Sequence, residues 1–96
     1  EIKPQADTRL HLLAQCHSSE LLLPRSVKER ALSVTEPGVE PLRTLWRGLA
    51  EDEYATAAVL GTAAVALALL QPGLGLADAD ALAQSLWRDR DTTRLA

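Results

Sequence analysis

The longest regular pattern in the chain is an uncharged stretch rich in Ala, Leu and Val that extends from Tyr54 to Leu70. Its apolar residues would occupy nearly every face of a helix, and such a helix is stable only in a core, in a membrane or against a partner. The acidic residues 51–53 stand where a helix N-terminus favours negative charge, and residues 71–73, Gln-Pro-Gly, end the pattern. The pattern predicts a helix that something else must cover.

The first third of the chain has the alternating pattern of β-strands. Residues 8–13 alternate, and a second short apolar run at 20–23 ends at Pro24. The polar residues 15–19 between them have the length of a hairpin loop, so we predict a β-hairpin. Residues 30–34 are a candidate third strand. The two faces of the first strand would carry Thr8, Leu10 and Leu12, and Arg9, His11 and Leu13.

Beyond Glu40 the hydrophobic period becomes that of a helix. A short helix starting at Pro41 would carry one apolar stripe, and a last helix over residues 77–88, capped by Asp78, would carry another. The stripes consist of Leu42, Leu45, Trp46 and Leu49, and of Ala79, Leu82, Ala83, Leu86 and Trp87. The two tryptophans are interpreted as packing anchors, and residues 89–96 as a frayed turn.

Together these elements predict an α+β fold, with a β-hairpin followed by about three helices. Residues 1–36 would form the hairpin and a connector, and residues 37–96 the helical part of the same domain. A chain of 96 residues makes one small domain or a piece of one. Only 3% of the residues are aromatic although 47% are hydrophobic, which suits close packing of helices.

Charge and cysteine content narrow the classes of function. The net charge of −3 gives no general attraction to nucleic acid. The single cysteine, Cys16, excludes an internal disulfide, so a cytoplasmic location is the default expectation. Residues 1–9 lack the pattern of a signal peptide. The uncharged stretch is shorter than a typical membrane span, so we expect no membrane insertion.

Few residues are candidates for chemistry. His11, Cys16 and His17 could contribute to a metal site, but no fourth ligand follows at a fixed spacing, and surface positions are the favoured interpretation. Cys16 as a nucleophile would need a positioned base. The acidic residues 51–53 could attract a cation, although a helix start already accounts for them. No nucleophile motif or phosphate loop is visible.

Basic residues suggest one alternative site. Arg25, Lys28 and Arg30 lie within six positions and could contact phosphate, with Arg43 and Arg47 as further contributors. Glu29 interrupts them, and no aromatic residue is interleaved for base stacking. A solvated connector is the favoured interpretation of this segment.

Five motifs follow one another in a recognisable order along the chain: Glu1-Ile2-Lys3-Pro4, Thr8-Arg9-Leu10, the short strand at 20–23, AVLGTAAVAL at 58–67 and ADADALA at 77–83. This order resembles the C-terminal part of anthranilate phosphoribosyltransferases and their paralogues. The resemblance covers nearly the whole chain, but only as the last part of a protein more than three times as long. In that family an alanine-rich helix near the C-terminus is followed by a helix packed on the same α/β domain.

The resemblance implies a role for the whole protein more than for this chain. Glu1 falls where the family carries the second acid of its magnesium-binding pair, which makes Glu1 the expected magnesium and cofactor contact. The glycine-rich phosphate loop and the anthranilate-binding groups would lie upstream. The family often has asparagine where this chain has Gly61. The expected partner is therefore the remainder of a homodimeric glycosyltransferase, or another chain, covering residues 54–70.

Two further hypotheses remain open. The chain could belong to a nucleic-acid-binding paralogue, whose basic groove would come mainly from sequence outside it. It could instead be a self-contained interaction module that oligomerises through its apolar helix. Because the chain opens on Glu1 without methionine, we expect a fragment of a longer polypeptide.

Overall fold

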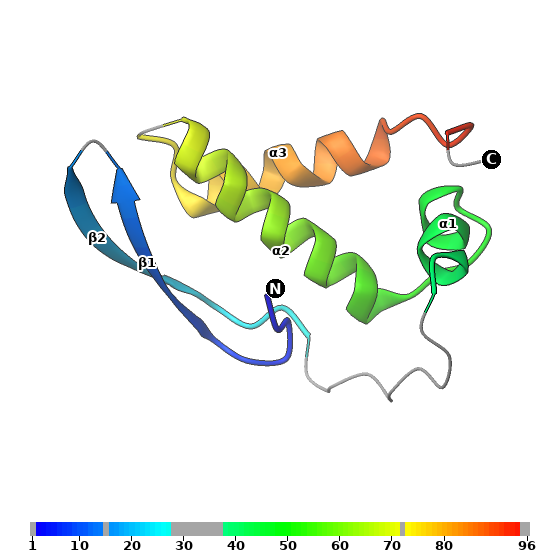
Figure 1. Ribbon diagram of the computed structural model, residues 1–96, viewed down its shortest axis with the longest axis horizontal. Helices are drawn as coiled ribbons and strands as arrows, with labels where there is room; N and C mark the ends of the chain where they lie inside the picture. The colour runs from blue at the N-terminus through cyan, green and yellow to red at the C-terminus, as the bar shows by residue number, and fades with distance from the viewer. Residues whose placement is uncertain (1, 15, 28–37, 72, 95–96) are drawn as a thin grey trace.

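The computed structural model describes residues 2–14, 16–27, 38–71 and 73–94 (Figure 1). Two strands, β1 (Thr8–Ala14) and β2 (His17–Leu23), precede three helices within these residues. The helices are α1 (Glu40–Trp46), α2 (Glu53–Leu70) and α3 (Leu76–Arg88). The predicted α+β order of a hairpin followed by three helices is confirmed. The candidate strand at 30–34 lies outside the described residues.

The strands β1 and β2 pair antiparallel, with Thr8 opposite Leu23 and Ala14 opposite His17. The predicted alternation is confirmed, because Leu10 and Leu12 are half-buried on one face while the side chains of the other face are exposed. The predicted loop at 15–19 is wrong. Pairing continues through Ser18 and Ser19, since a ladder is built from backbone groups and does not require apolar side chains.

Only positions 15 and 16 join the two strands, the shortest common hairpin connection. Cys16 adopts a φ of 65°, in the left-handed region that this kind of turn requires. A side chain with a Cβ is strained in that region, and glycine or asparagine would be the usual choice. The turn therefore replaces the expected polar loop at a small conformational cost.

The chain flanking the strands continues the pairing beyond them. The backbone N–H of Arg25 donates to Asp7 Oδ1 at 2.8 Å. The N–H groups of Ser26 and Val27 both donate to the Pro4 carbonyl, at 2.9 and 3.1 Å. The segment before β1 and the segment after β2 are thus held together at the base of the hairpin.

The N-terminal segment also anchors the hairpin to α2. Pro4 is fully buried, and the Tyr54 hydroxyl donates to Gln5 Oε1 at 2.7 Å. Ile2 approaches the helix closely, since a Cβ built on Gly61 would lie 3.1 Å from its Cγ2 atom. The absence of a side chain at Gly61 is what lets Ile2 lie against the helix backbone.

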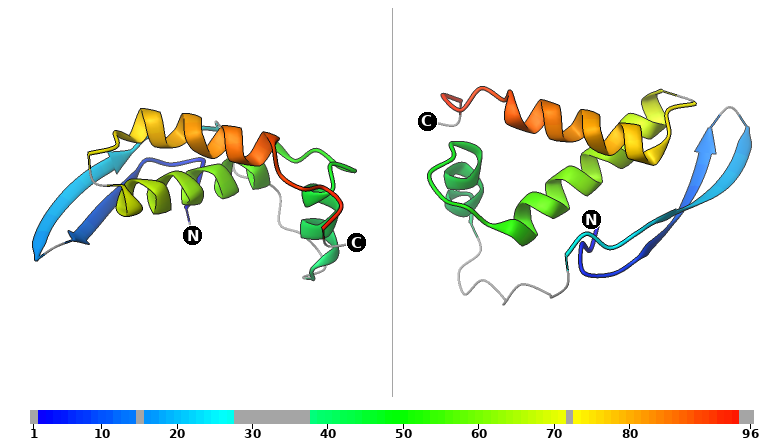
Figure 2. Two further views of the ribbon diagram at one scale, coloured as in Figure 1. Left: turned by 90° about the horizontal axis from the view of Figure 1, so that it is seen from above. Right: turned by 180° about the vertical axis from the view of Figure 1, so that it is seen from behind.

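The core lies between α2 and α3, which run in opposite directions and are joined by a short connection (Figures 1 and 2). Its buried centre consists of alanines, Ala64, Ala79 and Ala83, with exposed fractions of 1%, 0% and 2%. Small side chains let two helices approach closely, as the composition predicted. Partly buried residues surround this centre: Leu60, Ala63, Leu67, Ala68 and Leu74.

The hairpin does not bury α2. The helix packs on α3, and only two of its residues, Ala58 and Ala64, are buried. Figure 2 shows the hairpin extending beside the helices rather than lying under them. Two strands alone present too narrow an apolar face to cover an eighteen-residue helix.

The N-terminus of α2 is capped by an acidic residue, as predicted, whereas the N-terminus of α3 is not capped by the predicted aspartate. At α2 the Asp52 side chain accepts a hydrogen bond from the Ala55 N–H at 3.0 Å, as an N-cap does. At α3 the N-cap position is Gly75, so the predicted cap by Asp78 is wrong. The helix begins at Leu76, which places Asp78 within the first turn, where its charge favours the helix dipole.

Helix α1 is shorter and less buried than its apolar stripe predicted. Of its residues only Leu45 is buried, at 6% exposure, whereas Leu42 is 59% exposed. Gly48, with a φ of 75°, ends the helix, and the Leu49 N–H donates back to the Thr44 carbonyl at 3.0 Å. This arrangement matches a Schellman motif. Leu49 therefore lies beyond the helix and is 70% exposed.

Candidate interaction surface

One side of α2 is exposed and carries no charge. Thr62, Ala66, Leu69 and Leu70 are exposed at spacings of three and four residues, which places them on one side of the helix. The exposed fractions of Leu69 and Leu70 are 44% and 76%. We call these four residues the α2 surface. Exposed apolar patches of several hundred Å² mark contacts with other protein or with a membrane, which makes the α2 surface a candidate contact.

A cavity of about 370 Å³ opens beside this helix, between the N-terminal segment, α2 and α3. Its size falls in the range of small-molecule sites. Most of its wall is apolar, and its polar side chains are Arg25, Ser26, Asp80 and Gln84. The Gln84 side-chain amide donates to Asp80 Oδ2 at 2.7 Å, so that carboxylate already has a partner. The cavity can hold an apolar group, and the hydrogen bond that its carboxylate accepts comes from Gln84 rather than from the Ser26 hydroxyl.

A second hollow, of about 430 Å³, lies on the face of the hairpin. It is shallow and brings His11 opposite Glu20, its partner across the strands. Arg9 forms an ion pair with Glu20 at 2.8 Å, and both side chains are more than half exposed. Such an exposed pair contributes little to stability. The hollow has the geometry of a solvated sheet face.

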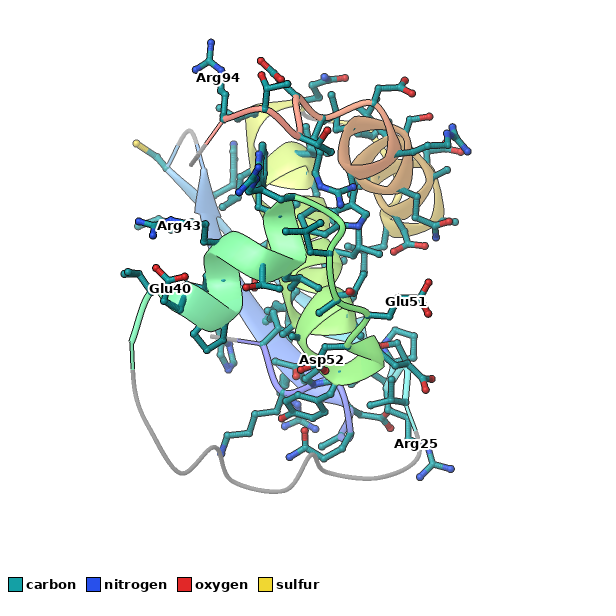
Figure 3. All side chains as sticks on the ribbon, turned by 90° about the vertical axis from the view of Figure 1, so that its right-hand side faces the viewer. Arg25, Glu40, Arg43, Glu51, Asp52 and Arg94 are labelled. Carbon is teal, nitrogen blue, oxygen red and sulfur yellow. The ribbon has the colours of Figure 1, made fainter. Side chains whose placement is uncertain are left out.

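The predicted basic cluster is only partly within the described residues. Lys28 and Arg30 lie outside them, while Arg25 is exposed. Arg43 forms an ion pair with Glu40 on its own helix. Figure 3 shows Arg25 and Arg43 on opposite sides of the molecule. Arg25 and Arg43 therefore do not lie on one basic stripe, and nucleic-acid binding stays a prediction.

The predicted magnesium contact, Glu1, also lies outside the described residues. Within those residues, no three side chains of His, Cys, Asp or Glu converge in a way that could hold a metal ion. Cys16 is exposed at the hairpin turn, and His17 is the first residue of β2 rather than part of a loop. The described side chains provide no fit for a magnesium ion.

Two of the acidic residues 51–53 have a structural role at the start of α2. Glu51, Asp52 and Glu53 are all exposed, and Figure 3 shows the first two at the start of the helix. Asp52 caps α2 and Glu53 lies in its first turn. The interpretation of this run as a helix start is confirmed for Asp52 and Glu53.

A cluster of two tryptophans and one arginine joins α1 to the end of α3. The rings of Trp46 and Trp87 meet edge to face, with centroids 5.8 Å apart. The Arg90 guanidinium lies 3.9 Å from the Trp87 ring centroid and 5.9 Å from that of Trp46. The interpretation of the tryptophans as packing anchors is confirmed. Sequence reasoning missed Arg90, because it lies in the segment predicted to fray and its partners are distant in sequence.

The turn after α3 holds an acid with an altered pKa. The Thr93 hydroxyl and backbone N–H both donate to Asp91 Oδ1, at 2.5 and 2.9 Å. These two hydrogen bonds favour the charged carboxylate and lower the pKa of Asp91 below its ordinary value. Asp91 is exposed, so the lowered pKa is explained by the hydrogen bonds of an ordered turn.

Among the described helices, α2 is the one long and apolar enough to cross a membrane by length and composition. A helix that packs within a soluble protein meets the same two criteria. Comparison with known proteins does not assign a family, since no family model, curated protein or solved structure matches the chain.

Proposed function

We propose that this chain is a non-catalytic scaffold segment of a larger protein, and that other parts of that protein cover the α2 surface. The observation that carries the proposal is the mismatch between the composition and the burial of α2. The helix is uncharged from Tyr54 to Leu70, yet only Ala58 and Ala64 are buried. An all-round apolar helix is stable when its faces are covered.

The positions of the candidate residues favour a scaffold over an enzyme. Cys16 is exposed at the hairpin turn, and the Asp80 carboxylate in the cavity is bonded to Gln84. Nucleophilic catalysis needs a base within hydrogen-bonding reach of the nucleophile. The cavity is lined by the Ser26 hydroxyl and the Asp80 carboxylate, and the hydrogen bond that Asp80 accepts comes from Gln84 rather than from Ser26. Chemistry in the whole protein would come from residues elsewhere.

For the class of the larger protein we propose an anthranilate phosphoribosyltransferase-like protein. The order of a hairpin, a connector, an alanine-rich helix and a second packed helix is the order on which the resemblance rests. The departure at Gly61 has a local reason, because an asparagine Cβ there would press on Ile2 Cγ2 at 3.1 Å. In this larger protein Glu1 would contact the magnesium ion. No step of the phosphoribosyl transfer is assigned to the described residues.

The mass and sequence of the natural polypeptide test this proposal. Mass spectrometry of the intact protein should give a mass several times 10.4 kDa, with a glycine-rich phosphate loop in the added sequence. The purified protein should then transfer phosphoribosyl groups in a magnesium-dependent reaction. A larger protein without the loop and without this activity would contradict the family and leave the scaffold role standing.

A natural mass near 10.4 kDa would contradict the scaffold proposal. The α2 surface would then favour the second candidate function, a self-contained module that oligomerises through this helix. Light scattering distinguishes the two, because such a module forms oligomers in isolation. Salt-sensitive binding of the intact protein to DNA would instead favour the nucleic-acid-binding paralogue.

A further inference from the structure

Helix α1 has few apolar contacts with the rest of the molecule. Leu45 is its one buried residue, while Val39 before the helix and Leu42 within it are 65% and 59% exposed. The chain leaves the helix through Gly48, and residues 49–51 are exposed. Segments with few buried apolar contacts open locally at a lower free energy than the core.

Arg90 supplies most of the polar contacts that hold α1. Its Nε donates to the Trp46 carbonyl at 2.7 Å, and Nη2 donates to the Leu45 carbonyl at 3.3 Å. On the other side, Nη1 donates to the Trp87 carbonyl at 2.7 Å. These carbonyls belong to the last turns of α1 and α3, and those of Leu45 and Trp87 also accept backbone N–H bonds from Gly48 and Arg90, at 3.2 and 3.3 Å. One guanidinium therefore bonds the negative ends of two helices.

The two tryptophans complete this attachment. The guanidinium lies over the Trp87 ring at 3.9 Å, a distance favourable for a cation–π contact. The Trp46 ring contacts Trp87 edge to face, and its Nε1–H donates to the Asp91 carbonyl at 2.8 Å. The attachment of α1 is thus concentrated in the last turn of α1 and in residues 87–91.

We propose that Arg90 is a latch that docks α1 onto α3, and that α1 undocks as one unit when this latch opens. The alanine core of α2 and α3 includes no residue of α1, so it stays packed in the undocked state. Undocking exposes Leu45 and separates Trp46 from Trp87. The docking of α1 by this latch is independent of what covers the α2 surface.

Hydrogen exchange measured by mass spectrometry on the natural polypeptide tests the latch. Arg90→Met keeps an apolar chain over Trp87 but removes the guanidinium donors. We expect exchange in residues 40–47 to become at least tenfold faster, with exchange in residues 76–88 unchanged. The matched control is Arg88→Met, because Arg88 is exposed and its side chain donates to Ser85 on its own helix. This control should leave both segments unchanged.

A second measurement needs no substitution. In the unaltered protein, exchange of α1 amides should be nearly independent of low urea concentrations, because undocking exposes little surface. Exchange of α3 amides should accelerate with urea, as in global unfolding. If both helices exchange with the same urea dependence, or if Arg90→Met leaves residues 40–47 as protected as before, α1 is not a latched unit.

Discussion

The ring of Trp46 meets the ring of Trp87 at an interplanar angle of 84°, and this contact connects helix α1 to helix α3. Edge-to-face aromatic pairs contribute about 0.5–1.5 kcal/mol beyond the burial of their surface. A double-mutant cycle with Trp46→Leu and Trp87→Leu should give a coupling free energy of about 1 kcal/mol. The readout is the opening free energy of α1 from hydrogen exchange. Additive effects of the two substitutions would show that the rings do not interact.

The cap at Asp52 predicts a difference between two aspartates at helix starts. Asp52→Ala should lower the free energy of unfolding by about 1 kcal/mol, because the Ala55 N–H loses its acceptor. Asp52→Asn should be close to the unaltered protein, since asparagine caps equally well. Asp78→Ala should cost less, because Asp78 contributes only its charge to the first turn of α3. Urea unfolding measures all three, and equal losses at both positions would contradict the assignment of the caps.

The close approach of Ile2 to Gly61 predicts coupling between these positions. Alanine favours a helix interior over glycine by about 1 kcal/mol. In the unaltered protein Gly61→Ala should gain little, because the new Cβ lies 3.1 Å from Ile2 Cγ2. In the Ile2→Ala background, which removes that atom, the same substitution should gain nearly the full amount. Equal gains in both backgrounds, measured by urea unfolding, would indicate that Ile2 does not lie against the helix.

The turn after α3 predicts the titration of Asp91. Thr93→Val removes the hydroxyl donor and should raise the pKa of Asp91 toward its ordinary value. The pKa of Asp91 is lower in the folded state than in the unfolded state, so its carboxylate stabilises the fold at pH values above the unfolded-state pKa. This stabilisation is lost as the pH falls through the folded-state pKa of Asp91. Titration of the carboxyl carbon by NMR measures the shift, and Thr92→Val is the control that should not change it.

The local elements were predictable because their patterns are local. The bounds of α2 follow from the acids before it and the uncharged run within it, and the structure starts the helix one residue earlier, at Glu53. The hairpin follows from alternation in residues 8–13. Its turn was missed because backbone pairing carries β2 through polar residues that resembled a loop.

The long-range contacts were not predictable from local patterns. Arg90 bonds to Leu45 and Trp46, which lie more than forty positions away in the chain. Leu42 satisfied the helical period of α1 but is exposed, because periodicity shows which residues share a side and not what covers that side. The role of Gly61 likewise depends on Ile2, which lies near the start of the sequence.

The covering of the α2 surface is the central claim, and thiol labelling of the natural polypeptide tests it most directly. Thr62→Cys places one reporter on this surface once Cys16 and any cysteine of the added sequence are replaced by serine, and Thr92→Cys places a reference in the exposed turn after α3. Maleimide should label Cys at position 92 rapidly and at position 62 at least a hundredfold more slowly, with equal rates in urea. Equal rates in the folded protein would contradict the account, because the apolar side of α2 would then be open to water.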